Sequence, residues 1–260
     1  MTGLVMVIAG VLGSAGHAEE FDRANLLFQQ ADYARAAEGY ERLIAEGVAH
    51  PAVFYNLGNA YYRLGRLGPA IANYERALCL EPGFDPARQN LAQCLSETEQ
   101  KLARPGPASW KKNFFFWHYE LPPRTIYRCA FISWLSLWGV LALRTWRPLP
   151  RLRIAAGVLA AVSIAFGVSA WHKAHPPRLA VVIAPETPAR YGAGERETVR
   201  FNLYEGDRVI MDQQRGEWVR VIVADGDRGW TRAQDLLPVG PPYVRAAGEG
   251  KDPAAGAGES

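Results

Sequence analysis

The sequence predicts a multi-domain membrane protein that contains an all-α solenoid of paired helices, a two-helix transmembrane hairpin and a small all-β domain. Three observations lead to this fold class. Residues 51–84 repeat the residue spacing of 17–50 with a period of 34. Two apolar segments follow, at 125–143 and 154–171. Residues 217–223 then alternate between two sets of side chains, as a half-buried strand does.

The 34-residue period depends on small and aromatic residues at recurring positions. A period of this length, built from two short helices, is typical of solenoid repeats, in which each repeat buries its apolar face against its neighbours. Small residues let the helices approach closely, and aromatic rings fill the space between them. The recurring sets are Tyr33, Ala36 and Tyr40 with Leu67, Ala70 and Tyr74, and Asn56, Leu57 and Gly58 with Asn90, Leu91 and Ala92.

The N-terminal residues 1–18 are predicted to be a signal peptide or signal anchor. Leu4 to Leu12 form an apolar run, and Gly16-His17-Ala18 has the small-x-small pattern of a cleavage site. No Lys or Arg precedes the apolar run, which is unusual for a signal sequence. We expect the helical-repeat domain to occupy residues 19–104.

The two apolar segments are predicted to be transmembrane helices. The second has 18 residues without a charge, so as a helix it spans about 27 Å, close to the thickness of a bilayer core. The link at 144–153 contains four Arg and no acidic residue, which indicates a cytoplasmic loop. The domains before and after the hairpin are therefore expected together in the periplasm, on the outer side of a bacterial inner membrane.

A junction at 105–124 precedes the first span and contains the aromatic run 114–119. Aromatic residues beside a span favour an interfacial belt at the headgroups, and a ligand-stacking patch is the alternative. Residues 105–177 carry nine basic side chains and one acidic side chain, whereas 19–104 and 178–240 are slightly acidic. Because the basic charge surrounds the apolar segments, it favours contact with the lipid bilayer over nucleic-acid binding.

Residues 178–238 are predicted to form short strands separated by turns with Gly and Asp, a pattern typical of a small β-barrel. The alternation in 217–223 places Trp218, Arg220 and Ile222 on one face and Val219, Val221 and Val223 on the other. The tail at 239–260 is rich in Gly, Ala and Pro and is expected to be disordered.

The segment from Phe54 to Pro82 resembles the tetratricopeptide repeat (TPR) consensus. The copy at 17–50 is weaker, and 85–101 resemble a last solvating helix, so the resemblance implies an all-α TPR solenoid of about two and a half repeats. TPR domains bind peptides and partner proteins along a concave face. The signature positions are occupied by Leu57, Gly58, Tyr61, Ala70, Tyr74, Ala77 and Pro82.

Residues 205–230 resemble bacterial SH3-like domains through Glu205-Gly206-Asp207, Trp218, Val221 and Gly229-Trp230. The order of leader, TPR domain, two-span hairpin and SH3-like barrel is similar to the BatE (Bacteroides aerotolerance) family over nearly the whole mature chain. That resemblance implies an inner-membrane scaffold of a Bat-type system. Its expected partners are membrane-bound proteins of the von Willebrand factor A type, and its expected role is in stress or oxygen tolerance.

In TPR domains the first helix of each repeat lines the peptide-binding groove. Asn25 and Asn56 match two asparagine positions of the family's carboxylate clamp, but the clamp's basic positions are occupied by Phe21, Pro86 and Asn90. An internal or hydrophobic segment of a partner is therefore the expected ligand, since a free C-terminus would lack its charge-assisted hydrogen bonds. In the alternative, the asparagines only cap and bridge helices. By register, the groove residues are Asn25, Asn56, Asn59, Tyr62, Arg63 and Asn90.

Two further side-chain roles stay open at this stage. Trp218 is interpreted either as part of a peptide groove in the SH3-like domain or as ordinary barrel packing. Cys79 and Cys94 fall on neighbouring predicted helices, where either a disulfide or two buried thiols is possible.

No catalytic motif accompanies these features. A P-loop, GxSxG, HExxH and GxGxxG are all absent from the sequence. His172 and His175 are three residues apart, but no Cys, Asp or Glu lies close enough in sequence to complete a metal site. The sequence therefore predicts a non-enzymatic protein without a metal or cofactor. A competing hypothesis is a cell-wall module that binds peptidoglycan and tethers a peptidoglycan-processing enzyme.

Overall fold

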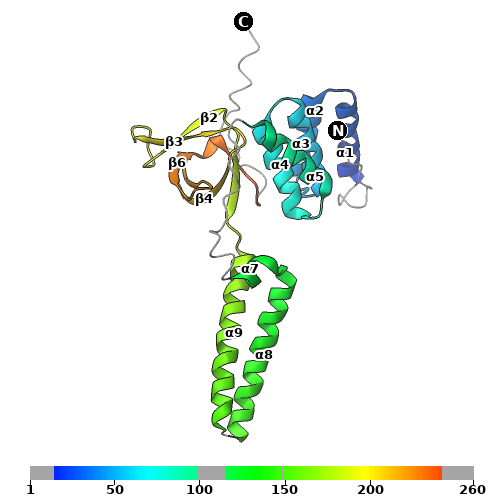
Figure 1. Cartoon of the computed structure of the whole chain (residues 1–260). Helices are drawn as coiled ribbons and strands as arrows, with labels where there is room; N and C mark the ends of the chain where they lie inside the picture. Colours follow the sequence, from blue (N-terminus) through cyan, green and yellow to red (C-terminus); the bar gives the residue numbers. More distant parts are fainter. Residues whose placement is uncertain (1–14, 99–114, 148, 242–260) are drawn as a thin grey trace. The chain divides into compact units, whose positions relative to one another are not determined.

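A computed structural model describes residues 15–98, 115–147 and 149–241 of the chain (Figure 1). The chain divides into two compact units, one made of residues 1–105 and 178–260 and the other of 106–177. The predicted helical repeats, the pair of long apolar helices and the antiparallel sheet are all present. Most of the predicted leader, the first half of the junction at 105–124 and most of the predicted tail lie outside the described residues.

Five helices form the described part of the repeat region, and their ends follow local sequence signals. Asp32 caps the second helix by accepting a hydrogen bond from the Arg35 amide, and Pro51 occupies the first turn of the third. The first helix begins inside the segment predicted as leader, and its Ala18 is buried. The helices are α1 (Ala15–Gln29), α2 (Tyr33–Ala45), α3 (Pro51–Arg63), α4 (Leu67–Leu80) and α5 (Asp85–Glu97).

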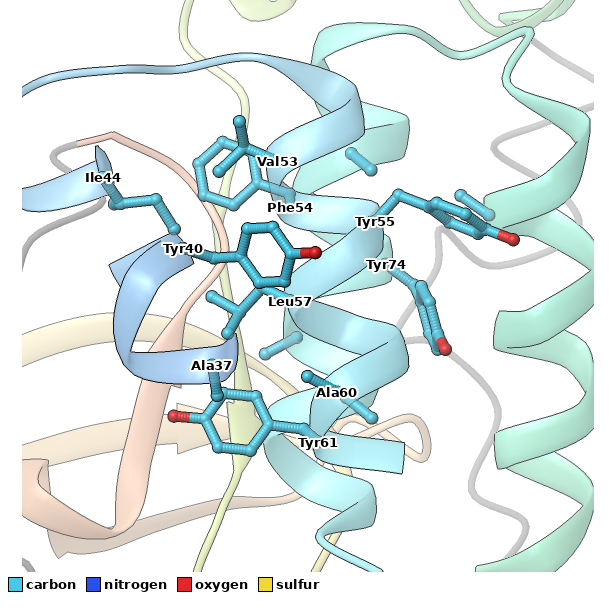
Figure 2. Close-up of a cluster of buried hydrophobic side chains, with 14 of the residues drawn as sticks. Ala37, Tyr40, Ile44, Val53, Phe54, Tyr55, Leu57, Ala60, Tyr61 and Tyr74 are labelled. Carbon is cyan, nitrogen blue, oxygen red and sulfur yellow. The ribbon is translucent and has the colours of Figure 1, made fainter. Parts of the chain in front are cut away.

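The core of the repeats is built from the aromatic and small residues that define the period. Figure 2 shows Tyr40, Phe54 and Leu57 in one buried cluster. A Cβ at Gly58 would lie 2.7 Å from Cε1 of Tyr74, so only glycine lets α3 approach the Tyr74 ring so closely. The role of Gly58 as a close-packing position is thus apparent in the structure.

The β region is a seven-stranded antiparallel sheet with the order β3-β2-β6-β5-β4-β1-β7. The order is open, with β3 and β7 as its edges, whereas the sequence predicted a small β-barrel. Val219, Val221 and Val223 share a buried cluster, as the alternation predicted. The strands are β1 (Arg178–Val182), β2 (Glu186–Arg190), β3 (Val199–Tyr204), β4 (Arg208–Arg215), β5 (Trp218–Ile222), β6 (Arg228–Arg232) and β7 (Leu236–Pro238), with a 3-10 turn, η2 (Ala233–Asp235), before β7.

The sheet region extends one residue beyond its predicted end at 238. Val239 is fully buried, and its amide donates a hydrogen bond to the Leu179 carbonyl. The disordered tail expected from residue 239 therefore cannot begin at that position, because Val239 contributes to the folded core.

The sheet packs against α4 within one compact unit. Leu179, Val181 and Val239 belong to the same buried cluster as the repeat helices. The Arg76 guanidinium donates to the Pro238 carbonyl from Nε and Nη2, at 3.0 and 2.8 Å. These contacts join two segments that the sequence predicted to be separate domains.

Two glycines allow the close approach of α4 and the sheet. The Gly68 amide donates to Oε1 of Glu205 at 2.8 Å, and a Cβ at Gly68 would lie 2.5 Å from the Val182 carbonyl oxygen. Gly206 has a φ of +89°, and its Cβ would lie 2.6 Å from Cγ2 of Thr98. Glu205 and Gly206, in the segment noted in the sequence for its SH3-like character, therefore also contact α4 and the end of α5.

The second unit is a helical hairpin, in which α8 and α9 lie side by side (Figure 1). It comprises α7 (Phe116–Glu120), α8 (Pro123–Trp146) and α9 (Pro150–Ala174). α8 and α9 are long and apolar enough to cross a membrane by length and composition. The predicted ten-residue loop at 144–153 is much shorter, because α9 begins at Pro150 with proline in its first turn. Arg144, Arg151 and Arg153 therefore lie in helix ends.

Most large side chains of the hairpin are exposed, and a hydrogen bond connects its two helical segments at one end. Large side chains such as Trp134, Trp138 and Ile164 are exposed. Near the start of α8 and the end of α9, Lys173 Nζ donates to the Leu121 carbonyl at 2.9 Å. The chain therefore enters and leaves the hairpin at the same end.

Candidate protein-binding site

Four of the six predicted groove residues form two hydrogen-bonded pairs between helices. Oδ1 of Asn25 accepts a hydrogen bond from the Tyr40 hydroxyl at 2.7 Å and another from Nδ2 of Asn56 at 3.1 Å. These three residues come from α1, α2 and α3, so the network joins the first repeat to the second.

The same network recurs 34 residues later in the chain. Oδ1 of Asn59 accepts from the Tyr74 hydroxyl at 2.8 Å and from Nδ2 of Asn90 at 2.8 Å. Burial raises the pKa of the Tyr40 and Tyr74 hydroxyls, so both stay protonated and act as donors. The network thus links α3 to α5 through α4 in the way that its first copy links α1 to α3.

The asparagines of both networks lie inside the protein. Asn25, Asn56, Asn59 and Asn90 are 4, 0, 0 and 8% exposed. Their side chains hydrogen-bond from helix to helix, and buried polar groups are stable only when paired in this way. This placement favours the alternative in which the asparagines bridge helices.

Tyr62 and Arg63 have a different environment, because they lie at the accessible end of α3. All residues of α3 from Ala52 to Tyr61 are buried, whereas Tyr62 is half-buried and Arg63 is exposed. The Tyr62 hydroxyl donates to Oε1 of Glu97 at 2.9 Å and accepts from Nε2 of Gln93 at 2.7 Å. The hydrogen bond to Glu97 is the main reason that the pKa of Tyr62 is raised.

Hydrogen bonds join Tyr62, Gln93 and Glu97, whereas the guanidinium carbon of Arg63 lies 5.9 Å from the centre of the Tyr33 ring on α2. We call these three residues and the neighbouring Arg63 the α3–α5 surface. Gln93 and Glu97 were not among the predicted groove residues. The period would have identified them, since Gln93 and Glu97 lie 34 residues after Asn59 and Arg63. The surface thus contains an aromatic ring with a hydrogen-bonded hydroxyl, a positive charge on Arg63 and a negative charge on Glu97.

Trp218, the candidate in the sheet, is largely buried but lines a cavity. The cavity has a volume of about 270 Å³ and is lined by Thr187, Pro188, Arg190, Glu195, Trp218, Arg232 and Asp235. Trp218 is paired with Arg232 across β5 and β6, and the Arg232 guanidinium carbon lies 5.8 Å from the centre of the indole ring. Both roles considered for Trp218, packing and groove wall, therefore have a structural counterpart.

The described residues contain no cluster of three or more His, Cys, Asp or Glu that could hold a metal ion. The rings of His118 and His172 are 6.2 Å apart, and Nδ1 of His118 lies 2.7 Å from the Ser169 hydroxyl. Cys79 is exposed and Cys94 is buried, and neither forms a disulfide bond. Burial raises the pKa of Cys94 to about 12, so this thiol is protonated at neutral pH.

The comparisons with known proteins agree with this architecture over the central repeat. The family model of the tetratricopeptide repeat matches residues 51–84, which include all of α3 and α4. No curated protein matches the chain. The chain therefore contains a tetratricopeptide repeat, a module that generally mediates binding to other proteins.

Proposed function

We propose that this protein is a non-enzymatic membrane scaffold whose TPR domain binds partner proteins through the α3–α5 surface. The observation that carries the proposal is the matched repeat at 51–84, which ends its first helix with the accessible pair Tyr62 and Arg63. Tyrosine and arginine are among the residue types that most often dominate protein–protein binding energies.

The contacts of Tyr62 support this assignment. Its hydroxyl is held between Gln93 and Glu97, so the ring is ordered before a partner arrives and little side-chain entropy is lost on binding. The buried asparagine networks below keep α1, α3 and α5 in register. A partner segment would then contact the ring of Tyr62 and the charges of Arg63 and Glu97.

The hairpin supplies the membrane anchor in this proposal. Its helices of 24 and 25 residues extend about 36–38 Å, and their exposed tryptophans and aliphatic side chains suit a lipid environment. Arg144, Arg147, Arg151 and Arg153 gather at the closed end of the hairpin, which favours a cytoplasmic position for that end. The unit with the repeats and the sheet would then lie on the periplasmic side of a bacterial inner membrane.

For the partner, we propose a membrane protein of the von Willebrand factor A type in a Bat-type complex for aerotolerance or stress. The support is the similarity of the domain order to the BatE family, together with SH3-like sequence features of the sheet. A partner in the same membrane also fits a short repeat array, because few turns of helix leave no room for a long ligand.

The proposal is tested by comparative pull-down of the full-length protein from solubilised membranes. A Tyr62→Ala, Arg63→Ala variant is expected to lose von Willebrand factor A-type proteins that the wild type recovers. Arg35→Ala is the matched control, since Arg35 is an exposed arginine on α2, outside the α3–α5 surface. Equal recovery of the same partners by all three proteins would refute this binding surface.

The topology needs an independent test with alkaline phosphatase, which is active only in the periplasm. A fusion after Pro241 is expected to be active, and a fusion at Leu149, between α8 and α9, is expected to be inactive. The opposite pattern in stable fusions would overturn the proposed orientation while leaving the partner-binding proposal standing.

A second candidate function is a cell-wall module that tethers a peptidoglycan-processing enzyme, and the cavity beside Trp218 is the observation that favours it. Retention on purified murein that survives Tyr62→Ala and Arg63→Ala but is lost with Trp218→Ala would support it. If both variants are still retained, or if the wild type is not retained, the sheet has no wall-binding site at this cavity.

A further inference from the structure

The cavity in the sheet is formed by residues that the strand register places side by side. Trp218 on β5 pairs with Arg232 on β6, and β6 pairs with β2 at Trp230 and Arg190. Pro188 on β2 and Arg232 on β6 both line the cavity as well. Three adjacent strands therefore supply an indole ring and two guanidinium groups to one cavity.

Arg190 has a donor that the described part of the protein leaves without a partner. Its Nη1 donates to the Glu197 carbonyl at 2.7 Å, but its Nε is buried and has no hydrogen-bond partner among the described residues. A buried guanidinium nitrogen without an acceptor is unfavourable. Since Arg190 lines the cavity, an acceptor from a ligand would satisfy it.

Arg232 is occupied by a carboxylate that is easily exchanged. It forms an ion pair with Glu195, whose side chain is 69% exposed. Glu195 lies in the connection between β2 and β3, close to Gly192 and Gly194. An ion pair with an exposed partner contributes little to stability, so a ligand carboxylate can replace Glu195 without disturbing the sheet.

We propose that this cavity binds the carboxylate of a peptide, with Glu195 occupying Arg232 when no ligand is present. The ligand carboxylate accepts hydrogen bonds from Arg232 and from Nε of Arg190, and its neighbouring residue packs on Trp218. Asp235, held by a 2.7 Å hydrogen bond from Thr187, accepts an N–H of the ligand. At about 270 Å³, the cavity suits one or two terminal residues, as it is slightly smaller than typical pockets for drug-sized ligands.

This assignment goes beyond the proposed partner binding by the TPR domain and does not depend on it. The test is calorimetric titration of the full-length protein in detergent with acetyl-Ala-Ala as the free acid and as the C-terminal amide. The acid is expected to bind at least about tenfold more tightly than the amide, because charge-assisted hydrogen bonds are lost with the amide. The same acid made of D-alanine distinguishes a murein stem peptide from a protein C-terminus, and preference for either acid over its amide supports the site.

Two variants make the assignment specific. Glu195→Gln is expected to tighten binding of the acid several-fold, since the competing internal carboxylate is removed. Arg190→Gln is expected to weaken it about tenfold, whereas Arg228→Gln, an exposed position at the start of β6, leaves it unchanged. Equal affinity for acid and amide, or no acid binding by the wild type and Glu195→Gln proteins, would overturn the proposal.

Discussion

Arg208 and Glu75 form an ion pair that joins the sheet to the repeats. Nη1 of Arg208 lies 3.0 Å from Oε1 of Glu75, and the two side chains are only 14 and 5% exposed. Their positions in the chain are 133 residues apart. Together with the Gly68–Glu205 hydrogen bond, the pair helps to fix how α4 and the sheet meet.

Removing one member of this pair should destabilise the unit strongly. Glu75→Ala leaves the Arg208 charge buried without this carboxylate, which costs about 3 kcal/mol or more. Urea unfolding of the full-length protein in detergent measures this loss. Asp227→Ala, which breaks the exposed Arg200–Asp227 pair, is the control and should cost less than about 1 kcal/mol. Equal effects of the two substitutions would contradict a structural role for the buried pair.

Gly68→Ala tests the close approach of α4 to β1. The new methyl group would meet the backbone oxygen of Val182, which cannot move without disturbing the strand, so we expect a loss of about 1–3 kcal/mol. Thermal unfolding followed by circular dichroism provides the measurement. Gly83→Ala is the matched substitution, because a methyl group added there would have no atom of the described residues within 4 Å. An unfolding temperature lowered equally by both would disprove the contact.

Asp207 makes the stability of the sheet depend on pH. Burial raises the pKa of its carboxyl from the usual 3.8 to about 6. Between these values the folded state holds a proton that the unfolded state has lost, so stability falls as pH rises through this window and stays lower above it. The difference in unfolding free energy is about 3 kcal/mol at most, since each pH unit contributes about 1.4 kcal/mol.

Asp207→Asn should remove this dependence while its side-chain oxygen still accepts the Tyr204 amide hydrogen bond. The variant is expected to be more stable than the wild type at pH 8, with a smaller difference near pH 4. Chemical denaturation at both pH values gives the comparison, and Asp225→Asn, at an exposed turn, controls for the loss of a surface charge. If the fall in stability between pH 4 and 6 is the same in the wild type and in both variants, Asp207 is not responsible for it.

Asn59→Ala tests the second hydrogen-bond network. It leaves the Tyr74 hydroxyl and the Asn90 amide without their shared acceptor, and we expect a cost of about 2–3 kcal/mol. Guanidinium-induced unfolding measures this cost. Asn202→Ala removes an exposed side-chain hydrogen bond to Glu186 and should change stability by about 0.5 kcal/mol or less. A comparably small effect at Asn59 would mean that the network does not hold α3 and α5 together.

Much of the fold could be predicted because its signals are local. The period of 34 depends on residues such as Gly58 and Tyr74, whose packing within one repeat is set by helix geometry alone. The alternation through Val219 and Val221 likewise reports which face of a strand is buried. Both patterns are present in the structure at the residues that predicted them.

The candidate site was harder to predict, because one spacing serves two purposes. Asn56 and Asn59 occur in the first helix of a repeat, where an asparagine can face a groove or bridge to the next helix. The hydroxyls of Tyr40 and Tyr74 donate hydrogen bonds to Asn25 and Asn59, which holds these asparagines in the bridging position. These hydrogen bonds become apparent only when the helices are packed. Glu75 and Arg208 gave no signal either, because separated charged residues are normally solvent-exposed.

The contact of α4 with the sheet has a consequence for how the protein is made. Gly68 and Glu205 are 137 residues apart, and both hairpin helices lie between them in the chain. At a synthesis rate of about 5–20 residues per second, the sheet that covers α4 is made on the order of ten seconds after α4 itself. Ile71 is fully buried in the finished protein and lies close to Gly206 of the sheet, so during that interval it lacks this cover. Because transiently exposed apolar surface promotes aggregation, a chaperone that shields α4 while the hairpin is being made is expected to raise the yield of folded protein.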